Sequence, residues 1–463
     1  MISFPRSSLL SGDAGPVSPT EATLGRPANS LYDARFWAAF IANTLVNAGV
    51  ALLYWYADFV RFLGGAEWHL GWIVGVGMIG SLAARLWLGT WIDRFGPRRV
   101  WLISVAALAT VLVSHVAITS HSGVPIFLLR IAYSSALAGV YSSSVTFISM
   151  RSPRPRLAEM VGMLGTSGFV GMVLGTQIGD LLFSGHRFGQ MQITGMFIAA
   201  GMLTVAAGLF SYCATIGQST PIRRRVPPVL WIVRRYQPGS ILLVGAAMGA
   251  GVAIPATFLR PYAAELGLPR IALFFTVYAP AAIATRIATR RMFERLGVPL
   301  MVLFGLTALA LSQILFLIVR SEWQLVVPGV VYGMAHAVLF PGIIAGGSST
   351  FPDRYRGLGT TLMLAMFDFG QLVGAPIAGG IIHFSAAFGV PGYSAMFATA
   401  GLSILAIAIV YAATARWREP PFPRRRWASR ATDRRSIDSS QSTAATRRRN
   451  RPRARTRAAS GRG

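Results

Sequence analysis

Residues 89–99 read GTWIDRFGPRR, a short charged and glycine-containing run between two long apolar stretches. The flanking stretches cover 68–91 and 100–119 and contain few charges of their own. An α-helix rises about 1.5 Å per residue, so roughly 20 apolar residues cross a ~30 Å hydrocarbon core. The stretch therefore predicts two transmembrane helices joined by a tight charged turn.

Apolar stretches of this length recur along nearly the whole chain. The composition agrees, because 53% of residues are hydrophobic and 13% are charged, against about 25% charged in soluble domains. The fold class is predicted as an all-α membrane protein with twelve transmembrane helices. The predicted spans are 37–57, 68–91, 100–119, 124–148, 158–183, 191–215, 240–260, 270–289, 299–319, 325–349, 358–383 and 394–415.

Arginines are distributed unequally between alternate loops. Cytoplasmic loops of membrane proteins carry an excess of basic residues, and one set of loops holds sixteen arginines against five in the other. This predicts a multi-pass protein of the plasma membrane, a bacterial inner membrane, with both termini in the cytoplasm. Residues 1–34 lack a basic start followed by an apolar core, so no removable signal peptide is predicted.

The sequence contains an internal repeat that divides the chain into halves. A shift of 201 residues places Arg85 and Gly96 on Arg286 and Gly297. A shift of 199 places other matching pairs, Tyr133 on Tyr332, Gly171 on Gly370 and Gly175 on Gly374. The predicted domains are two pseudo-symmetric six-helix bundles, 35–216 and 240–416, joined by a cytoplasmic linker, 217–239. Segments 1–34 and 417–463 are predicted to be disordered and cytoplasmic, the second arginine-rich and in contact with membrane lipid.

The opening run resembles the signature G-x-x-x-D-R/K-x-G-R/K-R/K of the major facilitator superfamily (MFS). It departs from that signature at Pro97. The resemblance implies a gate on the cytoplasmic side, in which Asp93 holds the two bundles closed until a transport step. The second copy is weaker, because Arg290 stands where the first has glycine. The gate residues implied are Gly89, Asp93, Arg94, Gly96, Arg98 and Arg99, with Glu294 and Arg295 in the second half.

Two looser motifs point to the same superfamily. Arg130 precedes Gly139 in the fourth span, which is similar to a family motif whose intramembrane arginine takes part in proton coupling. An arginine at membrane depth is costly unless it faces water or a carboxylate; the alternative is an arginine that extends to the headgroups. The fifth span has a glycine stripe similar to that of the family's antiporters, but Thr176 replaces the motif's proline. Close helix packing explains that stripe equally well.

Several polar residues lie at mid-depth in other spans. Asp368 lies in the eleventh span and is predicted, with Arg130, to take part in coupling, because an ionisable group at that depth responds strongly to its surroundings. The alternatives are an interhelical hydrogen bond for Asp368 and a satisfied core position for His336. The residues predicted to border the substrate are Asn43, Asn47, Tyr133, Tyr141, Tyr278, His336 and Gln371.

No catalytic motif is present, and no cofactor or metal is predicted. The chain contains no H-E-x-x-H and no G-x-S-x-G, and it has no lysine, which excludes a phosphate-binding P-loop. The single cysteine, Cys213, excludes an intramolecular disulfide and is expected to be a buried packing residue. The net charge of +27 belongs to loops and the tail and indicates topology rather than nucleic-acid binding. The chain is not expected to be an enzyme.

The function predicted from these features is secondary active transport of a small organic solute by alternating access. Proton coupling and efflux are favoured, and the protein is expected to act as a monomer whose partners are solute, protons and lipid. The alternatives are an uptake symporter or facilitator of a small organic acid or sugar, and a non-transporting membrane sensor with the same fold.

Overall fold

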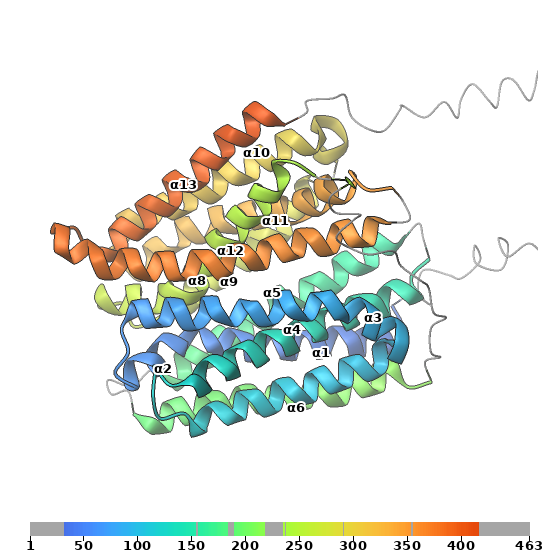
Figure 1. Cartoon of the computed structure of the whole chain (residues 1–463), viewed down its shortest axis with the longest axis horizontal. Coiled ribbons are helices and arrows are strands. Elements are labelled where there is room, and N and C mark those ends of the chain that lie inside the picture. The colour runs from blue at the N-terminus through green and yellow to red at the C-terminus, as the bar shows by residue number, and fades with distance from the viewer. Residues whose placement is uncertain are drawn as a thin grey trace, which may run out of the picture.

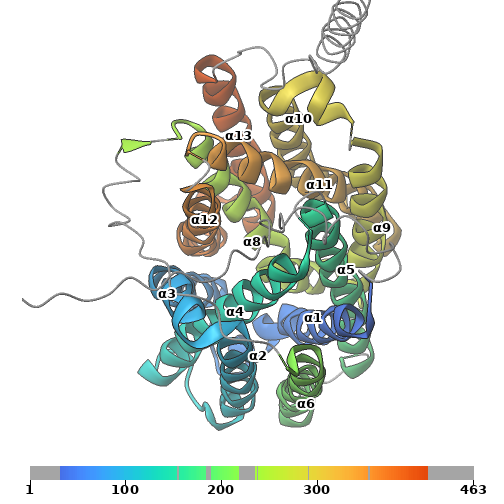
Figure 2. The ribbon, with the colours of Figure 1, turned by 90° about the vertical axis from the view of Figure 1, so that its right-hand side faces the viewer.

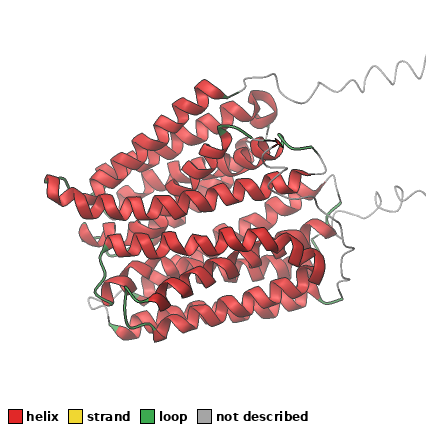
Figure 3. Cartoon of the chain, viewed as in Figure 1, coloured by secondary structure: helices red, strands yellow, loops and turns green. Residues whose placement is uncertain are grey.

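The chain folds into long helices, with no strand among the residues that the structure describes (Figure 3). The computed structural model describes residues 32–153, 156–183, 189–217, 235–236, 238–289, 291–352 and 355–415. Most of the predicted segments 1–34 and 217–239, and all of 417–463, lie outside them. The helices of the first half are α1 (Ala34–Leu52), α2 (Tyr56–Phe62), α3 (Glu67–Ser114), α4 (Val124–Arg151), α5 (Leu157–Leu182) and α6 (Gln190–Thr215).

The second half repeats this arrangement. Its helices are α8 (Ile241–Glu265), α9 (Ala272–Thr289), α10 (Met292–Leu315), α11 (Val326–Ser348), α12 (Arg356–Ser385) and α13 (Gly392–Thr414). Figure 2 shows α1–α6 and α8–α13 as two groups of helices viewed nearly end-on. The groups meet along two seams, one formed by α3 and α12 and the other by α5 and α9, and α2 also contacts α8. Figure 1 shows α3 and α12 side by side along the first seam.

α3 contains two membrane crossings that are joined at Gly96. This glycine has φ 81° and ψ 152°, outside helical values. A Cβ built on Gly139 of α4 would lie 2.2 Å from Oγ of Ser104 and 3.7 Å from Cδ2 of Leu88. Residues on either side of Gly96 thus face the same point of α4, so the chain reverses there. Within the described residues, eleven helices are long and apolar enough to span a membrane; because α3 counts twice, they contain the twelve predicted spans.

Two predicted span boundaries are wrong in a way that matters for the site. The first crossing does not end at 57 but bends through a short 3-10 turn, Leu53–Trp55, and continues as α2 to Phe62. The seventh crossing continues past 260 to Glu265, which places Arg260 inside α8 rather than in a loop. In both cases a charged residue was taken as the end of a span, although buried pairing lets the helix continue beyond it.

Gly96 is expected to be needed for the stability of the reversal. Its φ and ψ lie in a region that is essentially restricted to glycine, so a Cβ there would strain the backbone. Gly96→Ala should lower the free energy of unfolding by on the order of 2 kcal/mol. Thermal unfolding of the purified protein measures this effect. Gly89→Ala on the same helix is the control, since a Cβ there meets nothing within 4 Å. Equal melting temperatures for the two variants would show that Gly96 is not required.

The predicted pseudo-symmetry is present in the backbone. Gly297 has φ 78° and ψ 161°, almost the conformation of Gly96 at the equivalent position. A further match is found where α5 packs on α1 and α12 packs on α8. The Cβ of Gly171 would lie 2.2 Å from the carbonyl oxygen of Thr44, and that of Gly370 would lie 1.9 Å from the carbonyl oxygen of Ala246. The two halves therefore share this turn and this close helix contact.

The outer surface of the helix bundle is apolar, as a lipid-facing surface requires. Large side chains such as Leu86, Met202 and Leu209 are each more than 60% exposed. Cys213 also lies exposed on α6, so the expectation that it is buried is wrong. An apolar stretch alone does not distinguish the side of a helix that faces lipid from the side that faces protein.

Candidate functional site

The two halves are joined by a buried ion pair near one end of the bundle. We call the end where α1 begins and α13 ends the terminal side, and the opposite end the distal side. On the distal side, Nε of Arg260 in α8 lies 3.0 Å from Oδ2 of Asp58 in α2, with side chains 5% and 1% exposed. Asp180, near the end of α5, accepts backbone N–H bonds from Ile271 (3.2 Å) and Ala272 (2.9 Å) at the start of α9. The carboxylate of Asp180 thereby lies at the positive end of the α9 dipole.

The seam between α3 and α12 is close-packed on the distal side and separates toward the terminal side. A Cβ on Gly71 would lie 2.4 Å from the carbonyl oxygen of Ala375, so the backbones nearly touch there. On the terminal side, a Cβ on Gly89 of α3 or on Gly357 of α12 would meet nothing within 4 Å, and the same holds for Gly162 of α5. The closest backbone contact between α3 and α12 is therefore on the distal side, and these three glycines leave room for a neighbour on the terminal side.

Asp368 lies at mid-depth, at the level where this seam begins to separate. Its Oδ2 accepts hydrogen bonds from Nε of Arg85 (2.6 Å) and Oγ of Ser81 (2.6 Å), both on α3. The side chains of Arg85 and Asp368 are 15% and 6% exposed. A charge-assisted contact in so dry a setting is much stronger than one in water. Asp368 thus joins α12 of one half to α3 of the other.

Three of the polar residues predicted in the first half, Asn43, Asn47 and Tyr141, form a connected network between α1 and α4. The hydroxyl of Tyr141 donates to Oδ1 of Asn47 at 2.8 Å, and Nδ2 of Asn47 donates to the carbonyl oxygen of Asn43 at 2.7 Å. Nδ2 of Asn43 donates to Ser144 at 3.3 Å, while its Oδ1 is buried without a partner among the described residues. A buried amide oxygen of this kind is an acceptor available to a ligand or to water.

Two of the residues predicted in the second half, Tyr278 and His336, meet between α9 and α11. The Tyr278 hydroxyl hydrogen-bonds to Nδ1 of His336. Phe169 of α5 approaches this pair across the second seam, with its ring centroid 5.6 Å from that of Tyr278 and 6.0 Å from that of His336. Gln371 is half-buried on α12, one turn from Asp368. The site is therefore formed by both halves, with an aromatic side chain of the first half against a polar pair of the second.

Arg130 is buried within the first half and does not contact Asp368. Its guanidinium carbon lies 4.8 Å from the ring centroid of Tyr56 and 4.7 Å from that of Tyr133. Nε and Nη1 of Arg130 are buried without a hydrogen-bond partner among the described residues. The two rings stabilise the charge by cation–π attraction. The two residues predicted to act in coupling thus occupy different places, and the direct partner of Asp368 is Arg85.

The gate residues lie on the terminal side and do not contact the second half across the seam. Asp93 is exposed and makes no hydrogen bond or ion pair with any described residue, and Arg94 and Arg99 are also exposed. The guanidinium carbon of Arg98 lies 5.1 Å from the ring centroid of Tyr212 on α6, in the same half. Gly96 forms the turn and Gly89 faces open space, as described above. In the second copy, Arg295 is exposed, and the side chain of Glu294 lies outside what the structure describes. A closed gate would require the terminal side to come together.

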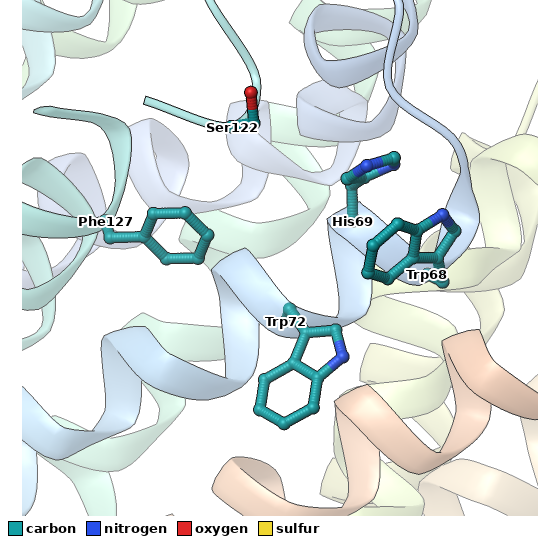
Figure 4. Close-up of a pocket in the computed structure, with 5 residues that line it drawn as sticks. All are labelled: Trp68, His69, Trp72, Ser122 and Phe127. Carbon is teal, nitrogen blue, oxygen red and sulfur yellow. The ribbon is translucent and has the colours of Figure 1, made fainter. Parts of the chain in front are cut away.

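A separate pocket lies on the distal part of the first half (Figure 4). It is lined by Trp68, His69 and Trp72 of α3, Ser122 in the following loop, and Phe127 of α4. None of the predicted site residues lines it. No group of three or more metal-binding side chains occurs within the described ranges. The region between the halves, where the predicted residues lie, is therefore taken as the candidate transport site.

A sequence profile described as Major Facilitator Superfamily matches residues 36–269 and 239–458 of this chain. Together the two matches cover most of the sequence, one on each half. The chain belongs to the Major Facilitator Superfamily. It is therefore a membrane transporter rather than an enzyme, and its fold is that of the superfamily.

Individual relatives of this superfamily member are distant. The Staphylopine export protein of Staphylococcus aureus (strain Mu50 / ATCC 700699) is 20% identical over 389 residues, which cover 80% of this chain and 92% of that protein. The crystal structure of the nucleoside transporter NupG has a TM-score of 0.67 at 14% identity, covering 84% of this chain and all of that one. A bacterial homolog of the human lysosomal transporter Spinster, inward-facing and unoccupied, has a TM-score of 0.63 at 13% identity, covering 84% and 96%. At these identities the solved structures show a common fold.

Sequence reasoning missed several residues of the site in this transporter. Arg85 was not predicted to belong to the site, although it lies about as far from the terminal side as Asp368, and this common depth was a usable signal. Asp58 and Arg260 were missed because the spans were ended too early. Tyr54 stacks on Phe275 of the other half, with centroids 4.6 Å apart, and nothing in the sequence distinguishes it from other aromatic residues.

Proposed function

We propose that this transporter moves a small organic solute by proton-coupled alternating access, with efflux as its direction. The solute would occupy the space between the halves, bordered by the Asn43–Asn47–Tyr141 network on one side and the Tyr278–His336 pair on the other. The single observation that carries the proposal is the position of Asp368 in an ion pair between the halves.

Proton coupling follows from what protonation would do to that contact. A neutral Asp368 loses the charge that attracts Arg85 at 2.6 Å, and removing one charge of a buried pair costs about 3–5 kcal/mol. The side chain of Arg85 stays 15% exposed, so a proton can reach the pair although it is largely buried. Protonation of Asp368 would therefore weaken the contact of α12 with α3 and allow the halves to rock.

Alternating access is supported by the distribution of contacts along the seams. The ion pairs between the halves among the described residues lie at mid-depth and on the distal side, and a Cβ on Gly89, Gly162 or Gly357 of the terminal side would meet nothing within 4 Å. With the termini in the cytoplasm, as the arginine distribution predicts, this conformation is inward-facing. Closure around Asp93 and the basic residues near it would then accompany opening of the distal side.

Efflux is supported by similarity to an export protein over most of both chains, although the identity is 20%. The proline of the antiporter motif is absent at Thr176 in α5, whereas α12 has Gly374, Ala375 and Pro376. Direction can be read from flux, because an exporter should accumulate solute in inverted vesicles when their interior is acidified. Accumulation into right-side-out vesicles driven by an inward proton gradient would instead establish uptake.

Proteoliposome flux tests the role of Asp368. A solute would first be identified by thermal-shift screening of purified protein against metabolites and antibiotics, and its transport then measured with and without a pH gradient. We expect Asp368→Asn to abolish accumulation driven by the gradient while exchange of labelled for unlabelled solute persists, since exchange needs no net proton movement.

Glu159→Gln provides the matched control for this substitution. Glu159 is an exposed carboxylate on the terminal side, where it accepts a hydrogen bond from Tyr32 of the same half. It should retain gradient-driven accumulation. If Asp368→Asn also retains it, Asp368 is not a coupling residue. If the reconstituted wild type moves none of the solutes that bind, the sensor alternative is favoured.

A further inference from the structure

The internal repeat places two arginines at equivalent positions, one in each half. Arg85 of α3 and Arg286 of α9 each lie 11 residues before the positive-φ glycine of their half, Gly96 or Gly297. Within the continuous helix α3, at about 1.5 Å per residue, this places Arg85 roughly 16 Å from its turn, about halfway across a ~30 Å core. Arg286 lies in the last turn of α9 and is half-buried. In a membrane-spanning bundle, both charges need a partner or water.

The position of Asp368, the ion-pair partner of Arg85, has an equivalent position in the other half. The helix contacts show which residues of α5 and α12 are equivalent. Gly171 contacts α1 as Gly370 contacts α8, and the two glycines are 199 residues apart. Gly175 and Gly374 confirm this correspondence, since a Cβ on each would lie within 3 Å of an alanine on the partner helix, Ala48 and Ala250 respectively. By that shift the position of Asp368 corresponds to Phe169.

The two equivalent contacts therefore differ in charge. Arg85 forms an ion pair with Asp368, whereas the guanidinium carbon of Arg286 lies 5.7 Å from the ring centroid of Phe169. Arg286 is half-buried and makes no hydrogen bond or ion pair with any residue that the structure describes. The ring stabilises part of its charge, but it leaves the guanidinium donors available.

A ligand can reach Arg286 from the terminal side. A Cβ on Gly165 of α5 would lie 3.7 Å from Nη1 of Arg286, and one on Gly162, one turn nearer the terminal side, would meet nothing. Phe169 also contacts Tyr278 and His336, so Arg286 and the polar pair face the same ring. A solute entering from the terminal side would meet the guanidinium together with this aromatic and polar surface.

We propose that Arg286 binds an anionic group, a carboxylate in the first instance, of the transported solute. The solute supplies the negative charge that Asp368 supplies to Arg85 in the other half. The guanidinium matches a carboxylate through two parallel N–H bonds, and Phe169 offers a flat apolar face for the rest of the solute. This inference rests on the proposed transport function and specifies its substrate class as small organic anions.

Binding to purified protein tests the proposal with a panel of aliphatic and aromatic carboxylates and the corresponding carboxamides. Thermal shift should detect stabilisation by at least one carboxylate and by none of the amides. Arg286→Gln should weaken that binding at least tenfold, since a charge-assisted hydrogen bond contributes about 1.5–3 kcal/mol. Arg286→Lys should bind more weakly than the wild type but still prefer carboxylate to amide, which separates a charge effect from misfolding.

Arg291→Gln is the control, because Arg291 is an exposed arginine of the same half at the start of α10. It should bind as the wild type does. The proposal is overturned if no carboxylate stabilises the protein, if the carboxylates stabilise Arg286→Gln equally, or if inorganic phosphate or chloride stabilises the wild type as well as they do. Gradient-driven transport of a neutral or cationic solute that is unaffected by Arg286→Gln would also overturn it while leaving the proposed function intact.

Discussion

Asp58→Asn is expected to shift the transporter strongly away from the conformation described here. The substitution leaves the guanidinium of Arg260, which is 5% exposed, without the carboxylate 3.0 Å away. Loss of one partner of a buried ion pair costs about 3–5 kcal/mol. This cost falls on the conformation with a closed distal side, because opening would let water reach Arg260. The equilibrium should therefore move toward a distally open state by roughly 100- to 1,000-fold or more.

Cysteine labelling from the distal side measures this shift. The exposed Cys213 is first removed by Cys213→Ser, and Thr276→Cys then introduces a probe at a contact between the halves, where Gln177 Nε2 donates to Thr276 Oγ1 at 3.0 Å. A membrane-impermeant maleimide should react much faster when Asp58→Asn is present.

Asp33→Asn is the matched control for the charge change. Asp33 pairs with Arg151 within the first half, both side chains are about one-third exposed, and such pairs contribute at most about 1 kcal/mol. Asparagine also retains the N-cap of α1. Labelling should then proceed at the unmodified rate. An unchanged rate in Asp58→Asn would show that its ion pair does not hold the distal side closed.

Gly370→Ala is expected to be among the most destabilising single-methyl additions in the chain. A Cβ at this position would lie 1.9 Å from the carbonyl oxygen of Ala246 and 2.7 Å from its carbonyl carbon. Both are backbone atoms, which cannot move aside as a flexible side chain can, so α12 and α8 would have to separate. Overpacking of this kind costs about 3 kcal/mol.

Thermal unfolding in detergent provides the measurement, with Gly380→Ala as control. Gly380 lies on the same helix, and a Cβ there meets nothing within 4 Å. The melting temperature of Gly370→Ala should fall by several degrees, while that of Gly380→Ala should stay near the wild-type value. Equal melting temperatures would mean that the close approach of α8 and α12 is not maintained in solution.

The fold was predictable because its determinants are local and repeated. Span length follows from helix geometry and bilayer thickness, and the turn at Gly96 is marked by charges and by its copy at Gly297. What could not be predicted is where a helix continues past a charge. Asp58 and Arg260 each resemble the end of a span when considered alone, and only the three-dimensional approach of α2 and α8 pairs them.

Knowledge of the site was limited in a similar way. Mid-depth residues such as Asp368 and His336 stood out because polar groups are rare there, and the structure brings His336 to Tyr278. Which residue pairs with which depends on how the halves dock, so Arg85 was not recognised as the partner of Asp368. To see that Arg85 faces a carboxylate and Arg286 a phenyl ring, one must know which residues of α5 and α12 are equivalent. The internal repeat shows this only approximately.

The contacts that close the distal side are distributed over both seams and the centre. Asp180 accepts hydrogen bonds from the start of α9, Asp58 pairs with Arg260 of α8, and Gly71 of α3 packs against the backbone of α12. A rigid half cannot release one of these contacts while keeping the others at bonding distance, because hydrogen bonds weaken within a fraction of an ångström. A partially opened form would lose most of the favourable contacts between the halves, while the separated groups would gain little contact with water. The transporter should therefore switch as a cooperative two-state device, with a rate that varies steeply with temperature.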